Sequence, residues 1–399
     1  MEYPDHINIL TADAVQLLKE MIAVPSPSFE EDAVCSHICQ WLDSHGIEHK
    51  RTGNNIIAEH IIDHTGPTLM MCAHIDTVSP SPEYSFDPYR PENCPEDMVQ
   101  GLGSNDDGAS VVSMIATYRY LCSSDSGSIG GKNRATPLAA GGGARDEVVG
   151  GVVFNPNATA APDTHMNLIL VLTCEEERSG KNGMTGLWSE LKDKVDYAIV
   201  GEPTGMKAAT AERGLLVIDA TAHGIAGHAA RNEGKNALYI ALEDIEKLRK
   251  HEFSRISPRM GKVNLNVTQI NAGSAHNVIP DRCDFVIDIR PTEQYTNEEI
   301  LKELQDICES ELKPRNLANR SSATFENSPL QKTAERLGIE TFSSPTTSDW
   351  MRITCDAVKM GPGESSRSHK KDEFVYVEEI RNGIQTYIDF INNYEHTLE

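Results

Sequence analysis

The first half of the chain alternates between amphipathic stretches and short runs that are entirely apolar. Apolar side chains recur at helical spacing in residues 11–23, which end before a Pro-Ser-Pro break, and again in residues 30–45. A third helical pattern begins at Gly108. Uniformly apolar runs are typical of strands buried on both faces. We expect such strands at 68–73, 166–173 and 197–200.

The pattern changes after about residue 215. Strand-like runs at 215–221, 262–270 and 283–290 accompany helical stretches at 236–249 and 297–311. A strand at 357–360 and a helix at 377–394 return to the first pattern. Strands that alternate with helices predict an α/β layer with a largely parallel sheet, and the middle segment predicts an inserted α+β domain. We therefore expect one domain from residues 1–211 and 325–399, and a second from 212–324.

Residues 123–165 follow neither pattern. Small and polar residues dominate this segment, and few large apolar side chains are present to hold a core. It is interpreted as a flexible insertion. Its glycine-rich stretch at 141–145 lacks the Gly-Lys-Ser/Thr ending of a phosphate-binding loop, so a nucleotide site is not expected.

Length and charge narrow the class of protein. A chain of 399 residues usually forms two domains, each with a core of its own. The formal net charge of -24 argues against a nucleic-acid or anionic-membrane surface, and no apolar run is long enough for a membrane span or a secretory signal. The nine cysteines lack Cys-x-x-Cys spacing and are interpreted as reduced thiols, so a cytoplasmic location is expected.

Acids and histidines gather where the expected strands end. His74 and Asp76 follow the first strand, Glu175–Glu177 follow the second, and Glu202 follows the third. The carboxyl ends of strands form the ligand crevice of an open α/β sheet, so these side chains should meet at one edge. Crowded carboxylates need compensating cations. Ligands of the His, Asp and Glu types, without thiolate, favour zinc or a similar divalent ion.

Seven motifs in order resemble those of the dizinc acylase and exopeptidase family, which includes acetylornithine deacetylase, succinyl-diaminopimelate desuccinylase and glutamate carboxypeptidases. The resemblance covers nearly the whole chain outside 123–165, and it implies a zinc-exopeptidase-like α/β domain with an inserted α+β dimerisation, or lid, domain. The motifs are His74-Ile-Asp76, Gly101-Leu-Gly-Ser-Asn-Asp-Asp-Gly108, Glu175-Glu-Glu177, Gly201-Glu-Pro-Thr204, Gly227-His-Ala-Ala230, His276-Asn-Val-Ile-Pro-Asp281, and Gly361-Pro-Gly363 with His369.

The resemblance implies a role for each matching residue of the first domain. Two zinc ions, with cobalt as a substitute, would be held by five ligands. Asp76 would orient the His ligand two residues before it, Glu176 would act as general base, and the peptide after Asp106 is often cis in this family. The implied ligands are Asp106 between both ions, His74 and Glu202 at one, and Glu177 and His369 at the other.

The second domain also carries matches. His228 resembles the histidine that reaches the partner's active site in a homodimer and stabilises the oxyanion. Asn277 and Arg290 resemble substrate-binding residues, and Arg290 is suited to grip a carboxylate. From the residues alone, Arg290 could equally pair with an acid of its own sheet.

The resemblance implies an amidohydrolase that removes the acyl group from a small amino acid. The stretches 227–234, 345–349 and 365–369 most resemble the acetylornithine deacetylase branch, so N-acetyl-ornithine or N-succinyl-ornithine, in arginine biosynthesis, is the expected substrate. Arg367 could recognise a carboxylate on a succinyl group. The alternatives are a succinyl-diaminopimelate desuccinylase, a dipeptidase or aminopeptidase, and a metal-dependent binding protein without activity.

Overall fold

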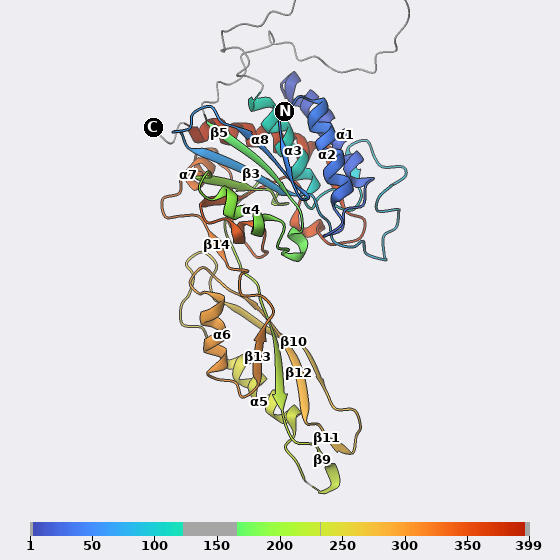
Figure 1. The fold of residues 1–399 in the computed structure, drawn as a ribbon, viewed down its shortest axis with the longest axis vertical. Coiled ribbons are helices and arrows are strands. Elements are labelled where there is room, and N and C mark those ends of the chain that lie inside the picture. Colours follow the sequence, from blue (N-terminus) through green and yellow to red (C-terminus); the bar gives the residue numbers. More distant parts are fainter. Residues whose placement is uncertain (1–2, 123–165, 232, 396–399) are drawn as a thin grey trace, which may run out of the picture.

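The computed structural model describes residues 3–122, 166–231 and 233–395, so the insertion expected at 123–165 lies outside the described residues. The described chain forms a wide body from which a narrower arm extends (Figure 1). The arm comes from the middle of the sequence, and the body comes from the chain on both sides of it.

A nine-stranded sheet forms the centre of the body. Its order is β1-β2-β5-β3-β6-β16-β7-β14, and β15 pairs with β7. The central strands β5, β3, β6 and β16 are parallel, whereas β1, β2 and β14 join antiparallel. The strands are β1 (Lys50–Thr52), β2 (Asn55–His60), β3 (Thr68–His74), β5 (Asn167–Thr173), β6 (Tyr197–Val200), β7 (Ala208–Glu212), β14 (Ser322–Ala323), β15 (Thr341–Ser344) and β16 (Asp356–Lys359). The expected parallel centre is confirmed.

Helices cover both faces of this sheet. Alternate residues of β3 point to opposite faces, so Met71 packs in the cluster that includes α1, α3 and α8, and Met70 packs in the cluster that includes α4. This double cover explains why β3 and β5 are buried throughout. The helices of the body are α1 (Asp5–Ile22), α2 (Asp32–Ser44), α3 (Gly108–Cys122), α4 (Met184–Leu191), α7 (Pro329–Arg336) and α8 (Val377–Glu395).

Two helix boundaries differ from the expectation. The first helix begins at Asp5 instead of residue 11, and Ile7 and Leu10 extend its buried face. The helix expected at 297–311 ends at Gln305, because Glu311–Pro314 form a strand that pairs with the edge of the arm sheet. In both places packing between elements decided the boundary, which helical spacing alone does not report.

The arm is a four-stranded antiparallel sheet with two helices packed on one face. Its order is β10-β12-β8-β13, and buried and half-buried residues alternate along β8 because only one face packs against helices. A short ribbon of β9 and β11 lies at the end of the arm farthest from the body (Figure 1). The elements are β8 (Leu216–His223), β9 (Gly227–His228), α5 (Ala237–Lys250), β10 (Asn264–Ala272), β11 (Val278–Ile279), β12 (Arg282–Arg290), α6 (Asn297–Gln305) and β13 (Glu311–Pro314).

Two crossings connect the body and the arm. The chain leaves the body after β7 and returns to it at β14, and these two strands pair with each other. The arm has a hydrophobic core of its own, separate from those of the body. We propose the boundaries 1–211 with 325–399 and 212–324 for the two domains, as expected from the sequence.

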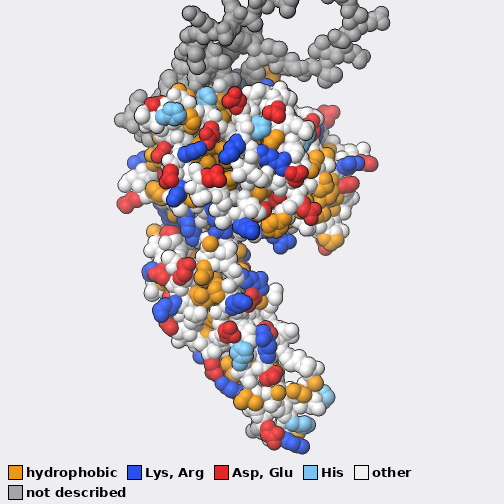
Figure 2. Space-filling model, in the orientation of Figure 1, with side chains coloured by type: hydrophobic (Ala, Val, Ile, Leu, Met, Phe, Trp, Pro, Cys, Tyr) orange, Lys and Arg blue, Asp and Glu red, His pale blue; other side chains and the backbone are white. Residues whose placement is uncertain are grey.

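The face drawn in Figure 2 shows no large patch of a single charge sign among the described residues. On the face in Figure 2, acidic and basic side chains are interspersed over both the body and the arm, although the chain as a whole carries a formal charge of -24. In the described ranges, no helix has the length and apolarity needed to cross a membrane. No disulfide bond joins any two of the nine cysteines, in line with their interpretation as reduced thiols.

Candidate metal centre

His74 is the last residue of β3, and Asp76 holds its imidazole from behind. The Nδ1 atom lies 3.0 Å from the Asp76 backbone oxygen and 3.5 Å from the Asp76 carboxylate. Nε2 lies on the other side of the ring, 3.3 Å from Asp106 Oδ1. A carboxylate behind a histidine fixes its tautomer and orientation, as is common for metal ligands. This is the geometry that the sequence motif predicts for these two residues.

Asp76 also fixes the two glutamates that follow β5. Its Oδ1 accepts the backbone N–H of Glu176 at 3.0 Å, and its Oδ2 accepts that of Glu177 at 3.2 Å. The Ser28 hydroxyl donates to Oδ2 at 2.6 Å. The chain enters this short 3-10 helix through Glu175, which has a left-handed φ of 60°. One buried carboxylate therefore sets the positions of an imidazole and two neighbouring acids.

Asp106 lies between two histidines. Its Oδ1 is 3.3 Å from His74 Nε2, and its Oδ2 is 3.6 Å from His369 Nε2. His369 Nε2 is also 2.9 Å from a carboxylate oxygen of Glu177. The Asp106–Asp107 peptide is cis, as the resemblance implies. A carboxylate with an imidazole at each oxygen is placed as a bridging ligand between two cations would be.

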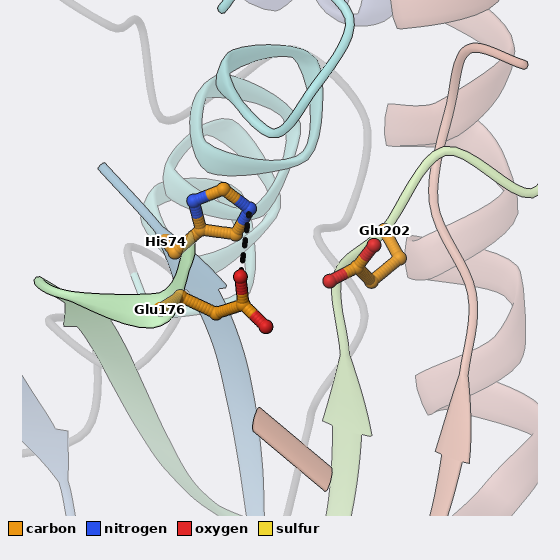
Figure 3. Close-up of side chains that lie close together, drawn as sticks. All are labelled: His74, Glu176 and Glu202. Carbon is orange, nitrogen blue, oxygen red and sulfur yellow. Dashed lines mark ion pairs between the residues drawn. The ribbon is translucent and has the colours of Figure 1, made fainter. Parts of the chain in front are cut away.

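Glu202 follows β6 and reaches the same edge of the sheet. In Figure 3, His74, Glu176 and Glu202 extend from their strand ends toward a common space, with Glu176 Oε2 4.0 Å from His74 Nε2. Among the described residues, two overlapping triads have donor atoms within 4.8 Å of one another. One triad is His74, Glu176 and Glu202, and the other is His74, Asp106 and Glu177.

The electrostatics of the cluster call for positive charge. Burial, together with nearby acids, raises the pKa values of Glu176 and Glu202 well above those of ordinary glutamates. The pKa of His74 is also well above its usual value: burial opposes the cation, but the hydrogen bonds to Asp106 and Asp76 favour it more strongly. Nitrogen and oxygen donors without thiolate fit a pair of divalent cations. The cluster therefore has the ligands and the charge for a dinuclear metal site.

Glu373 is a buried acid that the sequence pattern did not point to. Its carboxylate accepts the backbone N–H groups of Gly103, Asn105 and Asp106 at 3.1, 2.9 and 2.9 Å. Burial and the charge of Asp106 raise its pKa to about 8. It lies directly before the strand β17 (Phe374–Tyr376), outside the motifs that carry the resemblance and far in sequence from the loop that it holds.

Asp349 is a second buried acid near the cluster. It accepts a hydrogen bond from the Thr173 hydroxyl at 2.7 Å, and burial raises its pKa to about 6. It belongs to a stretch, 345–349, that carried part of the sequence resemblance. In the sequence, this stretch indicated only the substrate branch, although it also marks the position of Asp349 near the cluster.

The structure does not bring His228 or Asn277 to the candidate metal centre of the same chain. His228 lies in β9 at the far end of the arm, and Asn277 lies beside it, since its backbone oxygen accepts the Ala229 N–H at 3.0 Å. Arg290 ends β12 and pairs with Asp288 at 2.9 Å. The alternative considered for Arg290, an ion pair with an acid of its own sheet, is therefore present in the structure.

Arg367 does not offer its guanidinium to the cluster. Both of its terminal nitrogens donate to the Glu379 carboxylate, at 2.6 and 3.0 Å, and the guanidinium carbon lies 4.6 Å from the centre of the Phe374 ring. This bidentate carboxylate partner engages two of the five N–H donors of the guanidinium. The expectation that Arg367 reads an acyl carboxylate stays a prediction, and it requires that the acyl group share Arg367 with Glu379 or displace it.

The α/β body with the cluster at its strand ends, joined to the α+β arm, is similar to the architecture of solved M20 peptidases. Residues 210–316, which include the whole arm sheet, match the profile described as a peptidase dimerisation domain, M20_dimer. Succinyl-diaminopimelate desuccinylase of Wolbachia pipientis subsp. Culex pipiens (strain wPip) is 24% identical over 411 residues, covering 96% of this chain and 93% of that protein.

The solved structures of two peptidases are similar in fold to this chain. The aminopeptidase PepT from Bacillus cereus ATCC 10987 matches with a TM-score of 0.70 at 17% identity, over 96% of this chain and 99% of that one. The YXEP protein of Bacillus subtilis, a dinuclear metal binding peptidase from the M20 family, matches with a TM-score of 0.68 at 16% identity, over 96% and 98%. These matches confirm the expected fold class. The matches to the dimerisation profile and to the desuccinylase agree with the expectation of a metallohydrolase that acts on amide bonds. The assignment to the acetylornithine deacetylase branch has no such support.

Proposed function

We propose that the protein is a metal-dependent deacylase of N-acyl amino acids. The observation that carries the proposal is the position of Asp106 between His74 and His369. The Glu176 carboxylate lies beside the His74 imidazole. The ligand roles proposed here are those implied by the sequence: Asp106 bridges, His74 and Glu202 bind one ion, and Glu177 and His369 bind the other. Zinc is the proposed metal.

The proposed reaction is hydrolysis of the amide between acyl group and amino acid. Bound divalent ions would supply Lewis-acid polarisation of the scissile carbonyl. Glu176 accepts a proton from the attacking water and donates it to the leaving nitrogen. The backbone N–H bond from Glu176 to Asp76 fixes the base relative to His74. The burial that raises the pKa of Glu176 favours its holding the proton between the two transfers.

Succinyl-diaminopimelate is the substrate we propose first. The support is the similarity to succinyl-diaminopimelate desuccinylases over nearly the whole chain. N-acetyl-ornithine and N-succinyl-ornithine, favoured by short stretches of the sequence, come second. With Arg367 bound to Glu379, an acyl carboxylate would have to share Arg367 with Glu379 or displace it.

We further propose that the active form is a homodimer. The match to a dimerisation domain supports this, and so does the position of His228 at the end of the arm, remote from the metal centre of its own chain. In a twofold dimer, His228 of each chain would stabilise the oxyanion at the partner's centre. Asn277, at the same end of the arm, would accompany it, and Arg290 would contact the substrate only by exchanging its Asp288 partner.

The test is hydrolysis by purified, zinc-loaded protein. Succinyl-diaminopimelate, N-acetyl-ornithine and N-succinyl-ornithine are assayed for release of free amine, with a chelated sample as the control. Chelator-sensitive release of free amine from an acyl amino acid supports the proposal. The preferred substrate then distinguishes a desuccinylase from an acetylornithine deacetylase. No release from any of the three would overturn the deacylase assignment.

Peptide hydrolysis is the second candidate, because the fold matches an aminopeptidase with a TM-score of 0.70. Dipeptides and tripeptides therefore belong in the same assay. Cleavage of peptides without deacylation would keep the metal chemistry and change the substrate class. A protein that binds metal but is inert on every substrate would favour the binding-protein alternative.

A further inference from the structure

Two opposite charges are buried side by side next to the metal centre. Lys359 is the last residue of β16 and Glu212 the last residue of β7, and their charged groups lie 3.1 Å apart. Their side chains are 1% and 0% exposed. Neither residue is a candidate metal ligand or base, so the proposed chemistry leaves this pair unexplained.

Both residues hold the same segment of chain, residues 344–348. Lys359 Nζ donates to the Thr346 backbone oxygen at 3.0 Å and to the Thr346 hydroxyl at 3.3 Å. Glu212 accepts the Ser348 hydroxyl at 2.7 Å. On its other side, Glu212 accepts the Ser322 hydroxyl of β14 at 3.3 Å. The pair thus ties segment 344–348 to two strands of the sheet.

Residues 344–346 of this segment form part of the wall of a pocket that also contains Glu202. The pocket has a volume of about 270 Å³, and the turn that follows Glu202 also lines it. Its lining includes Glu202, Thr204, Ser344, Pro345, Thr346 and Lys359. A pocket of this size that opens onto a candidate metal ligand is suited to part of a small substrate.

A contribution to the folding stability of the protein does not by itself explain why this ion pair is buried. Taking two charges out of water costs free energy that their attraction often fails to recover, and apolar side chains of similar size are frequently as stabilising. The pair also orients its neighbours, because three hydrogen bonds from Lys359 and Glu212 fix the positions of Thr346 and Ser348. We infer that Lys359 and Glu212 are positioning residues that hold the 344–348 wall of the substrate pocket at a fixed distance from Glu202. This inference rests on the proposed function in one respect, that the substrate enters this pocket.

The main test replaces both charges with apolar side chains, K359M/E212M, which avoids leaving one charge buried alone. The expected result is a folded protein with the metal content of the parent and a KM for its best substrate raised about tenfold or more, because a displaced wall misplaces the substrate. The change in kcat should be smaller than the change in KM. Metal content is measured by elemental analysis and folding by thermal melting.

Two serine variants form a matched pair that keeps both charges. S348A removes a bond between Glu212 and the pocket wall, whereas S322A removes a bond between Glu212 and β14. We expect a raised KM for S348A and an unchanged KM for S322A. Equal effects of the two variants, or a fall in melting temperature without any change in KM, would assign the pair a purely structural role.

Hydrogen–deuterium exchange makes the test independent of turnover. In metal-loaded K359M/E212M, backbone amides in residues 341–352 should exchange faster than in the parent, while those of β3 and β5 should not. Unchanged exchange at 341–352 overturns the inference even if the enzyme is active. Absence of turnover by the parent on every substrate overturns the proposed function, and the exchange result then still decides whether the pair positions this segment.

Discussion

The Glu373 carboxylate accepts the backbone N–H of Asp106 at 2.9 Å, across 267 positions of sequence. The same oxygen accepts the N–H of Asn105 at 2.9 Å, so the loop that carries the bridging candidate is fixed by a side chain that is not a ligand. Partners of this kind orient the groups that bind metal. Glu373 therefore belongs to the site as the residue that holds the loop of Asp106.

Replacing Glu373 should weaken metal binding. In E373A the loop loses its acceptors, and we expect affinity for the ions to fall about 10- to 100-fold, the range usual for lost outer partners of a metal site. E373Q keeps an oxygen for the N–H groups of Asn105 and Asp106 and should lie much closer to the parent. Competition with a chromophoric chelator measures the metal affinity of both variants. An E373A variant with the metal affinity of the parent would contradict the role of Glu373 as an outer partner of the metal site.

Adjacent glutamates should fail in different ways. For E176Q we expect retained metal and a kcat lowered about 10²- to 10⁴-fold, because the proton-transferring group is lost. For E177Q we expect lost metal as well, because Glu177 holds His369 at 2.9 Å and is itself a proposed ligand. Elemental analysis beside steady-state kinetics separates the two. Metal loss in E176Q would instead make Glu176 a ligand.

Metal binding should strengthen as the pH rises toward 9. The hydrogen bond to Glu177 raises the pKa of His369 to about 9 in the metal-free protein, so this imidazole carries a proton at neutral pH. A ligand must give up that proton, and each proton displaced makes the apparent affinity rise about tenfold per pH unit below the pKa. Above pH 9 the dependence on this group ends. Calorimetry in two buffers of different ionisation enthalpy counts the released protons, and H369Q should release fewer.

Two inactive variants should restore activity when mixed. H228A retains Glu176, and E176Q retains His228, so a mixed dimer has one centre at which both groups are intact. Random exchange of subunits should recover about a quarter of parental activity, since half the dimers are mixed and each has one complete centre. The mixture is unfolded and refolded together, with each variant alone as the control. No recovery despite confirmed mixed dimers would place His228 outside the partner's site.

The sequence predicted the elements whose signal is local. The uniformly apolar runs that became β3, β5 and β6 were visible because both of their faces are buried, and the acids after them were visible because strand ends share one edge of the sheet. The His74–Asp76 contact and the approach of Asp106 to two histidines followed from the motifs. The ligand and base roles themselves stay predictions.

Groups that act across long separations could not be predicted in this way. Glu373, Lys359 and Glu212 carry no motif of their own, and only the fold brings them to the loops that they hold. The strands β7 and β13 were also missed, because their sequences, Ala-Ala-Thr-Ala-Glu and Glu-Leu-Lys-Pro, contain no run of large apolar residues. For a related reason, the proximity of Arg367 to His369 in the sequence did not reveal its partner Glu379.

The order of the chain has a consequence for how the protein is made. The arm is continuous from Leu216 to Pro314, so on the ribosome it can complete its sheet and core as soon as it has emerged. The body cannot, because β16 and α8 are synthesised after the arm and supply a central strand and a core helix. His369 also arrives late. The edge that carries the candidate metal ligands is therefore completed only near the end of translation. The arm can fold earlier, while β14, β15 and β16 are still missing from the body sheet.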